Sequence, residues 1–292
     1  MKIALFGRNF NDTFNTVIQN LISKFSANGI ELLIYRPFHQ FLTEQKRFSF
    51  SFSGYFDHHN NLPKDTDYLI SIGGDGTFLE AITVIRDSGI PILGINAGRL
   101  GFLANVTSHE TDQAIDWLIS KKYEIEERSL LEFASDQMVF SDYPNALNEC
   151  TIQKAGSSLT TFHVTINDEY IISYWADGLI IATPTGSTAY SLSVGGPIVL
   201  PQSNDFIITP IAAHNLNVRP LVIPDSARLS ITVEGRTDHY LATLDSRSAK
   251  CNINNKINIS KAQFSIRMIK LPEINFYSTL RNKLMWGSDK RN

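Results

Sequence analysis

The sequence lacks the features of several common protein classes. Its two cysteines, Cys150 and Cys251, are too few for a disulfide framework. Its seven histidines show no spacing typical of metal ligands, so we expect no protein-bound structural metal. No apolar run is long enough to cross a membrane, and the run at residues 2–6 ends too soon for a signal peptide. These absences favour a cytoplasmic globular protein that does not act at a membrane.

The chain also lacks an excess of charge of one sign. It has 26 Lys and Arg against 29 Asp and Glu, which gives a formal net charge of −3. That balance provides no broad basic surface for nucleic acid or an anionic membrane, so we expect neither as a partner. Any anionic ligand must therefore be bound by local groups.

Hydrophobic residues make up 43% of the 292 residues, enough for two folded domains with separate cores.

Residues up to about 125 alternate between strand-like and helix-like patterns. This alternation predicts an open parallel sheet with helices on both faces, a Rossmann-like α/β domain. Residues 38–63 have no clear period, and we expect an excursion with one short helix, either a packed loop or a substrate lid. The expected strands are 3–6, 31–35, 68–72 and 90–95, and the expected helices are 13–25, 78–87 and 110–120.

After residue 130 the helical period fades and short strand-like runs dominate. Residues 162–166 and 170–174 flank Asn167-Asp168-Glu169, which predicts a hairpin. Many short strands separated by polar turns favour an all-β, sandwich-like second domain.

Gly73-Gly74-Asp75-Gly76-Thr77 lies between an expected buried strand and a helix. Glycines here allow a sharp turn and a close backbone approach to a ligand, and the helix N-terminus favours a phosphate. A carboxylate suits plain phosphate binding poorly, but Asp75 could orient a hydroxyl that attacks a phosphoryl group. The alternative is an ordinary strand-to-helix turn in which Asp75 is the N-cap.

A second polar segment runs from Asp177 to Pro197. A short apolar stretch is followed by Thr185, Gly186, Ser187 and Thr188, which offer hydroxyl and backbone donors. Tyr190 adds a ring on which a nucleobase could stack.

Taken together, Gly73-Gly74-Asp75-Gly76, Asn148-Glu149 and the segment 177–197 resemble the NAD kinase family. The segments 96–103 and 219–222 and the tail 276–284 fit the same family, so the resemblance covers nearly the whole chain. The GGDG element alone is shared with diacylglycerol and sphingosine kinases, whereas the combination with the long polar segment is highly specific.

The resemblance implies phosphorylation of the 2′-hydroxyl of the adenosine ribose of NAD, giving NADP. The donor would be ATP or another phosphoryl donor, and magnesium would arrive with the nucleotide. It implies a phosphate-binding α/β domain at 1–125, a β-rich NAD-binding domain at 126–272 and a C-terminal segment, 273–292, that returns to the first domain. It also suggests a homodimer or homotetramer.

The resemblance further implies roles for individual residues. Asp75 would be the catalytic group that accepts or orients the hydroxyl proton, and Asn148 and Glu149, as an amide and a carboxylate, would bind the adenine side of NAD. The phosphate-binding residues would be Gly73, Gly74, Gly76 and Thr77. The NAD-binding residues would be Asp75, Gly76, Asn148, Glu149, Asp177, Thr188, Ala189, Tyr190, Ser191, Leu192, Ser193 and Ala212.

Two residues and two alternative functions stay open at this point. Trp175 could stack against nicotinamide or pack in the core, and Arg247 could meet a phosphate or be solvated. A lipid kinase of the diacylglycerol or sphingosine type would need an apolar slot, for which the polar run 185–193 is unsuitable. A non-catalytic NAD-binding sensor would not need Asp75.

Overall fold

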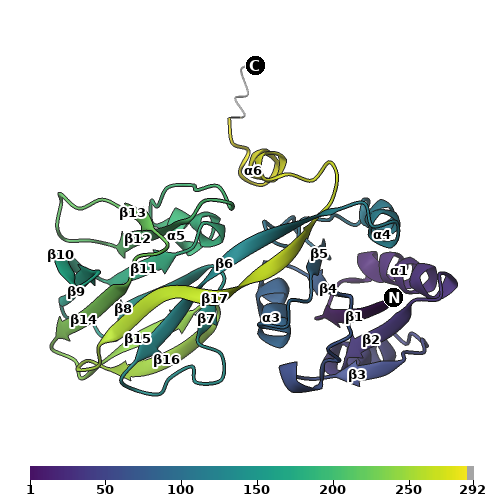
Figure 1. Ribbon diagram of the computed structural model, residues 1–292, viewed down its shortest axis with the longest axis horizontal. Coiled ribbons are helices and arrows are strands. Elements are labelled where there is room, and N and C mark those ends of the chain that lie inside the picture. The colour runs from purple at the N-terminus through teal and green to yellow at the C-terminus, as the bar shows by residue number, and fades with distance from the viewer. Residues whose placement is uncertain (288–292) are drawn as a thin grey trace. The chain divides into compact units, whose positions relative to one another are not determined.

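A computed structural model describes residues 1–287 of the chain (Figure 1). The chain divides into two compact units. The first comprises Met1–Glu127 together with the chain from Ile266 onward, and the second comprises Arg128–Ser265. No helix of the described part is long and apolar enough to cross a membrane.

The first unit is built on a parallel sheet with the strand order β5-β4-β1-β2-β3. Because the order reverses between β1 and β4, the carboxyl ends of these two strands form the kind of edge at which open α/β sheets bind ligands. The Gly-Gly-Asp-Gly turn begins at the end of β4. The strands are β1 (Lys2–Gly7), β2 (Glu31–Tyr35), β3 (Gly54–Phe56), β4 (Tyr68–Gly73) and β5 (Ile92–Asn96).

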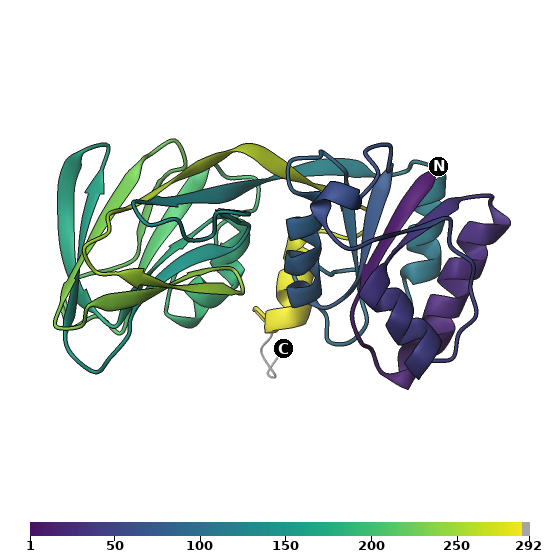
Figure 2. The same cartoon turned by 90° about the horizontal axis from the view of Figure 1, so that it is seen from below.

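Helices cover both faces of this sheet, as Figure 2 shows. Alternate residues of β1 point to opposite faces: Ile3 and Leu5 join the core formed with α1 and α4. Helix α3 buries Phe78, Ala81 and Ile82, and it contacts β4. The helices are α1 (Asn15–Ala27), α3 (Asp75–Ile85) and α4 (Thr111–Ile119).

The segment 38–63 contains more regular structure than we expected. A short helix, α2 (Arg36–Gln40), continues into one π turn, Phe41–Gln45, and strand β3 follows. Three residues of strand are too few to show a period of two in the sequence. Phe38 and Phe41 are buried against Phe10, so this part of the segment is packed structure.

The second unit contains an antiparallel sheet with the order β13-β12-β11-β8-β15-β16. A second sheet contains β10, β9 and β14, with β17, β6 and β7 beside them. Ile152 and Ile181 of the first sheet share one core with Phe162 and Ile231 of the second. The strands are β6 (Glu124–Ser135), β7 (Asn145–Ala146), β8 (Glu149–Lys154), β9 (Thr160–Ile166), β10 (Glu169–Ala176), β11 (Gly178–Ala182), β12 (Asp205–Ile211), β13 (Leu221–Pro224), β14 (Leu229–Gly235), β15 (His239–Leu244), β16 (Arg247–Asn252) and β17 (Ile257–Lys270).

These two architectures confirm the predicted fold class, an open parallel α/β sheet followed by an antiparallel β-sandwich. The predicted hairpin joins β9 and β10 through Asn167 and Asp168. Both residues have positive φ, 50° and 67°, as a type I′ turn requires. Cys150 and Cys251 are free thiols, buried in the core of the second unit.

The chain returns to the first unit through the end of β17. Met268 of β17 pairs in parallel with Ile92 of β5, so residues 266–272, which we had grouped with the β-rich domain, cluster with the parallel sheet. Helix α6 (Phe276–Leu284) follows and belongs to the same unit. Its Phe276 ring lies 6.2 Å from the Phe102 ring, centroid to centroid.

Candidate functional site

The glycine-rich turn after β4 is compact on one side and open on the other. A Cβ at Gly73 would lie 2.3 Å from Thr77 Oγ1, so no side chain fits there. A Cβ at Gly74 or Gly76 would meet no atom within 4 Å, which leaves their backbone accessible. Helix α3 starts at Asp75, so the positive end of its dipole lies at this turn. The turn thus has the form that binds phosphate groups.

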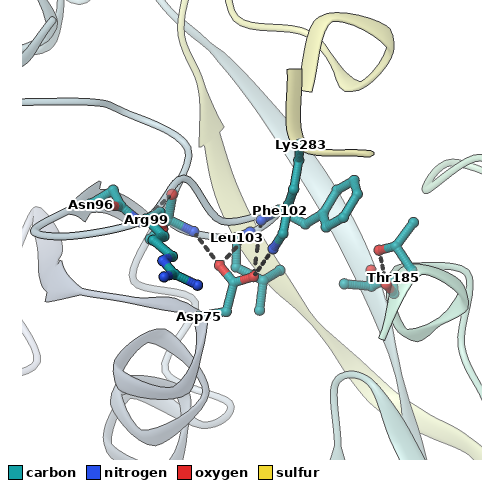
Figure 3. Close-up of polar contacts among 9 residues, drawn as sticks. Asp75, Asn96, Arg99, Phe102, Leu103, Thr185 and Lys283 are labelled. Atoms are coloured by element: carbon teal, nitrogen blue, oxygen red, sulfur yellow. Dashed lines mark hydrogen bonds and ion pairs between the residues drawn. The ribbon is translucent and has the colours of Figure 1, made fainter. Parts of the chain in front are cut away.

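The Asp75 side chain does not cap the helix. Gly74 occupies the N-cap position, so the alternative of Asp75 as an N-cap is wrong. The carboxylate turns instead to the loop after β5, as Figure 3 shows. There it accepts three backbone hydrogen bonds, from the N–H groups of Phe102 at 2.9 Å, Leu103 at 2.9 Å and Ala104 at 3.0 Å.

Lysine 283 of α6 is the fourth donor to this carboxylate. Lys283 Nζ lies 3.3 Å from Asp75 Oδ2, and both side chains are partly exposed. We did not predict Lys283 as a site residue, although it lies in the tail 276–284, which resembles the NAD kinase family.

The loop that binds Asp75 is itself held in place. The Asn96 side chain donates to the carbonyl oxygens of Arg99 at 2.6 Å and Ala104 at 3.3 Å, and it accepts from the Gly98 N–H at 2.7 Å. Gly101 is packed so closely that a Cβ on it would lie 2.0 Å from Asp75 Oδ1. The segment 96–104 therefore positions the carboxylate.

In the second unit, Asp245 holds the backbone around Asn148. Its carboxylate accepts hydrogen bonds from the N–H groups of Leu147 at 2.9 Å, Asn148 at 2.8 Å and Glu149 at 3.3 Å. Burial raises the pKa of Asp245, although these hydrogen bonds oppose that effect. We did not predict a role for Asp245, because no local sequence pattern links it to residues 147–149.

We expected an ionised carboxylate at Glu149, but its environment favours the protonated form at neutral pH. Burial, and then the neighbouring Asp245 charge, raise the pKa of Glu149 to about 8, while a hydrogen bond from the Tyr190 backbone opposes the shift. Within residues 1–287, Glu149 Oε2 has no hydrogen-bond partner. A neutral carboxyl with an unused oxygen can both donate and accept a hydrogen bond.

The polar segment 185–193 forms a 3₁₀ turn, Thr185–Thr188, and a one-turn helix, α5 (Tyr190–Ser193). Ser191 is buried and its hydroxyl lies 3.0 Å from Thr209 Oγ1, so this hydroxyl stabilises the turn. Tyr190 is 37% exposed, and its hydroxyl accepts a hydrogen bond from Gln153 Nε2 at 3.2 Å. Its ring is therefore available to a ligand.

The remaining predicted NAD-binding residues lie near the surface of the same unit. Thr188, Ala189 and Leu192 are half-buried, and Ser193 is exposed. Asp177 forms an ion pair with Lys154 Nζ at 2.5 Å. Ala212 is exposed and has a φ of 48°.

The two open residues now have clear positions. Trp175 is 50% exposed, so core packing is the wrong interpretation. Arg247 donates to the carbonyl oxygens of Tyr143 and Asn145 and stacks on the Tyr143 ring at 4.9 Å, so it stabilises the protein and is not a solvated surface residue.

The structure thus forms two clusters, each inside one unit. The first joins the turn 73–77, the loop 96–104 and Lys283. The second joins Asn148 and Glu149 to Asp245 and Tyr190. Among the described residues, no group of three or more His, Cys, Asp and Glu side chains could bind a metal ion.

Comparison with known proteins finds similarity to NAD kinases along the chain. A family model described as the ATP-NAD kinase N-terminal domain matches residues 23–123, and one described as the ATP-NAD kinase C-terminal domain matches residues 147–271. An NAD kinase of Flavobacterium psychrophilum is 48% identical over 295 residues, and one of Cytophaga hutchinsonii is 45% identical over 293 residues. Each alignment covers 100% of both chains.

Solved structures share the fold at lower sequence identity. The yeast NADH kinase complexed with NADH is 21% identical, with a TM-score of 0.83 over 99% of this chain and 88% of that one. An NAD kinase from Archaeoglobus fulgidus in complex with ATP is 22% identical, with a TM-score of 0.73 over 98% of this chain and 99% of that one.

Proposed function

This chain belongs to the NAD kinase family, and we propose that the cluster around Asp75 is its phosphoryl-transfer site. As an NAD kinase, it phosphorylates NAD to NADP with ATP. The observation that supports the assignment most is the position of the Asp75 carboxylate, which three backbone N–H groups hold at the start of α3, beside the open glycine turn.

In the proposed reaction, Asp75 accepts a hydrogen bond from the 2′-hydroxyl of the adenosine ribose. The hydroxyl oxygen forms a bond to the terminal phosphorus of ATP, the bond from that phosphorus to the bridging oxygen breaks, and ADP leaves. The hydroxyl proton passes to Asp75 and then to water. Positioning and charge stabilisation provide most of the acceleration in such transfers. Gly73, Gly74, Gly76 and Thr77 form the turn that would bind the phosphates, with the α3 dipole behind them.

The second cluster is proposed to bind NAD. Glu149, in its neutral form, would donate a hydrogen bond to NAD through the oxygen that has no partner in the described protein, and Asn148 would bind beside it. Tyr190 would offer its exposed ring to a base. The other proposed NAD contacts are Asp177, Thr188, Ala189, Ser191, Leu192, Ser193 and Ala212. For Ser191 a backbone contact is the better proposal, because its hydroxyl is already bonded.

Several properties stay predictions. Magnesium is proposed to enter with ATP, bound mainly by its phosphates. A homodimer or homotetramer is proposed, and light scattering of the purified protein would test it. We propose a cytoplasmic location. The lipid-kinase and sensor alternatives lose their basis, since the full-length relatives are named NAD kinases.

The test of Asp75 is NADP formation by the Asp75→Asn variant. We expect the kcat to fall by about 10² or more, the usual scale for a positioned acid–base group. An amide nitrogen cannot accept the loop hydrogen bonds, so the variant also needs a measured Tm and NAD affinity. Near-normal turnover in a folded Asp75→Asn protein would contradict the assignment.

A further inference from the structure

The Asp75 carboxylate has no free position for a substrate hydroxyl. A carboxylate offers about four lone-pair sites, two on each oxygen. Oδ1 accepts the N–H groups of Leu103 and Ala104, and Oδ2 accepts the N–H of Phe102 and the ammonium of Lys283. A hydroxyl that binds to Asp75 must therefore replace one of these four donors.

Lys283 is the donor that can leave. The three backbone donors belong to consecutive residues of a loop that Asn96 holds from inside and that packs against Asp75 through Gly101. The Lys283 contact is the longest of the four, 3.3 Å, and the Lys283 side chain is 31% exposed. A long, partly exposed side chain exchanges its partner at far lower cost than a fixed backbone N–H group.

The displaced ammonium would stay in the site. A capping box between Asn275 and Ser278 fixes the start of helix α6, and the buried Leu280 packs the helix against the protein. Lys283 Nζ also lies 4.6 Å from the centroid of the Phe102 ring, a cation–π distance. The lysine can thus move off the carboxylate and remain beside it.

We propose that Lys283 occupies the fourth acceptor position of Asp75 until the 2′-hydroxyl of NAD replaces it, and that its ammonium then stabilises the transferred phosphoryl group. This inference rests on the proposed role of Asp75. The attacking oxygen is hydrogen-bonded to Asp75 when it bonds to phosphorus, so the phosphoryl oxygens arrive next to the released cation. Lys283 keeps its proton throughout, and its charge offsets the negative charge of the phosphoryl oxygens in the transition state.

The experiment compares Lys283→Met, Lys283→Arg and Arg281→Met in the full chain. Arg281 is an exposed cation on the same helix, so its replacement removes one charge and serves as the matched control. For each variant the kcat and the KM for NAD and ATP are measured, together with the NAD Kd without nucleotide and the Tm.

We expect Lys283→Met to lower kcat by about 10–100-fold, the scale for loss of one transition-state contact. Its NAD Kd should stay the same or become tighter, because the hydroxyl no longer has to displace a cation. Lys283→Arg should recover most of the kcat, and Arg281→Met should match the wild type. The Tm should barely change in all three.

Three outcomes would overturn the proposal. The first is a kcat of Lys283→Met within twofold of wild type. The second is a weaker NAD Kd in Lys283→Met, because removal of a cation that NAD has to displace cannot weaken NAD binding. The third is a loss of kcat that follows a loss of Tm and that arginine does not restore, which would make the lysine a structural tether. If Asp75→Asn is inactive in the same assay, the proposed function survives each of them. Near-normal turnover of Asp75→Asn would remove both.

Discussion

Replacing Gly101 with alanine should disturb the Asp75 carboxylate without straining the backbone. The added Cβ would lie 2.0 Å from Asp75 Oδ1, 2.7 Å from its carboxyl carbon and 3.0 Å from Oδ2. Gly101 does not have a left-handed φ, so alanine can adopt its conformation. The clash is with the carboxylate itself, and either the loop or the Asp75 side chain has to move.

The size of the effect follows from the contacts that are lost. Relief of a 2.0 Å contact requires a shift of over ~1 Å, since nonbonded carbon atoms sit at about 3.5–4.0 Å from their neighbours. Such a shift breaks one or two of the backbone hydrogen bonds to the charged carboxylate, each worth about 1.5–3 kcal/mol. We expect a loss of roughly 2–4 kcal/mol of unfolding free energy, which corresponds to a Tm lower by about 5–10 °C. A displacement of about 1 Å also lowers kcat by about 10².

The matched control is Gly98→Ala in the same loop. A Cβ at Gly98 meets nothing within 4 Å, and the Gly98 N–H can still donate to Asn96. Its stability should stay within about 0.5 kcal/mol of wild type. The assays are thermal unfolding and NADP formation with saturating NAD and ATP. If Gly101→Ala unfolds at the wild-type temperature with wild-type kcat, the loop 96–104 does not position Asp75.

Three further predictions concern the NAD-binding cluster. The pKa of Glu149 is raised from 4.5 to about 8, so the stability that its protonated form contributes is fully present below pH 4.5 and is lost as pH rises through 8. Glu149→Gln cannot ionise, so at pH 8.5 its free energy of unfolding should exceed that of wild type by on the order of 2–3 kcal/mol. Equal pH profiles of the two proteins in urea titrations would refute this. Asn148→Ala and Glu149→Ala should raise the KM for NAD more than the KM for ATP, and calorimetry showing intact NAD affinity in the double variant would contradict this. Tyr190→Ala should weaken NAD binding about ten- to a hundredfold with little change in Tm, and Tyr190→Phe should cost less; an unchanged Kd for Tyr190→Ala would exclude its ring as a contact.

Local sequence patterns predicted most of the parallel sheet. The bounds of β2, Glu31–Tyr35, agree with the apolar run in the sequence, because strands buried on both faces are continuous in hydrophobicity. Helix α3 begins at Asp75, three positions before the expected Phe78, because apolar spacing marks only the buried turns of a helix. Gly74 at the N-cap gives no such signal.

The partners of the predicted site residues could not be read from local sequence. The loop that binds Asp75 lies 27–29 residues further along the chain, and Lys283 lies 208 residues away. Asp245 is separated from Asn148 by 97 residues. These contacts form only when the sheets bring distant turns together, so no periodicity or spacing encodes them. For the same reason, the raised pKa of Glu149 could not be foreseen from its neighbours in sequence.

The two buried thiols can report how often the sheet around them opens. Cys150 directly follows Glu149 on β8, and Cys251 lies on β16 opposite Tyr240. Burial raises the pKa of both thiols, so the native state presents neither a thiolate nor an accessible sulfur to an alkylating reagent. Alkylation of Cys150 must then wait for β8 to separate from its neighbours, and its rate measures how often that happens. Added NAD should slow the alkylation of this cysteine, because a ligand that binds at Glu149 stabilises β8 in its native position. The change in rate would report NAD binding at β8 without a mutation.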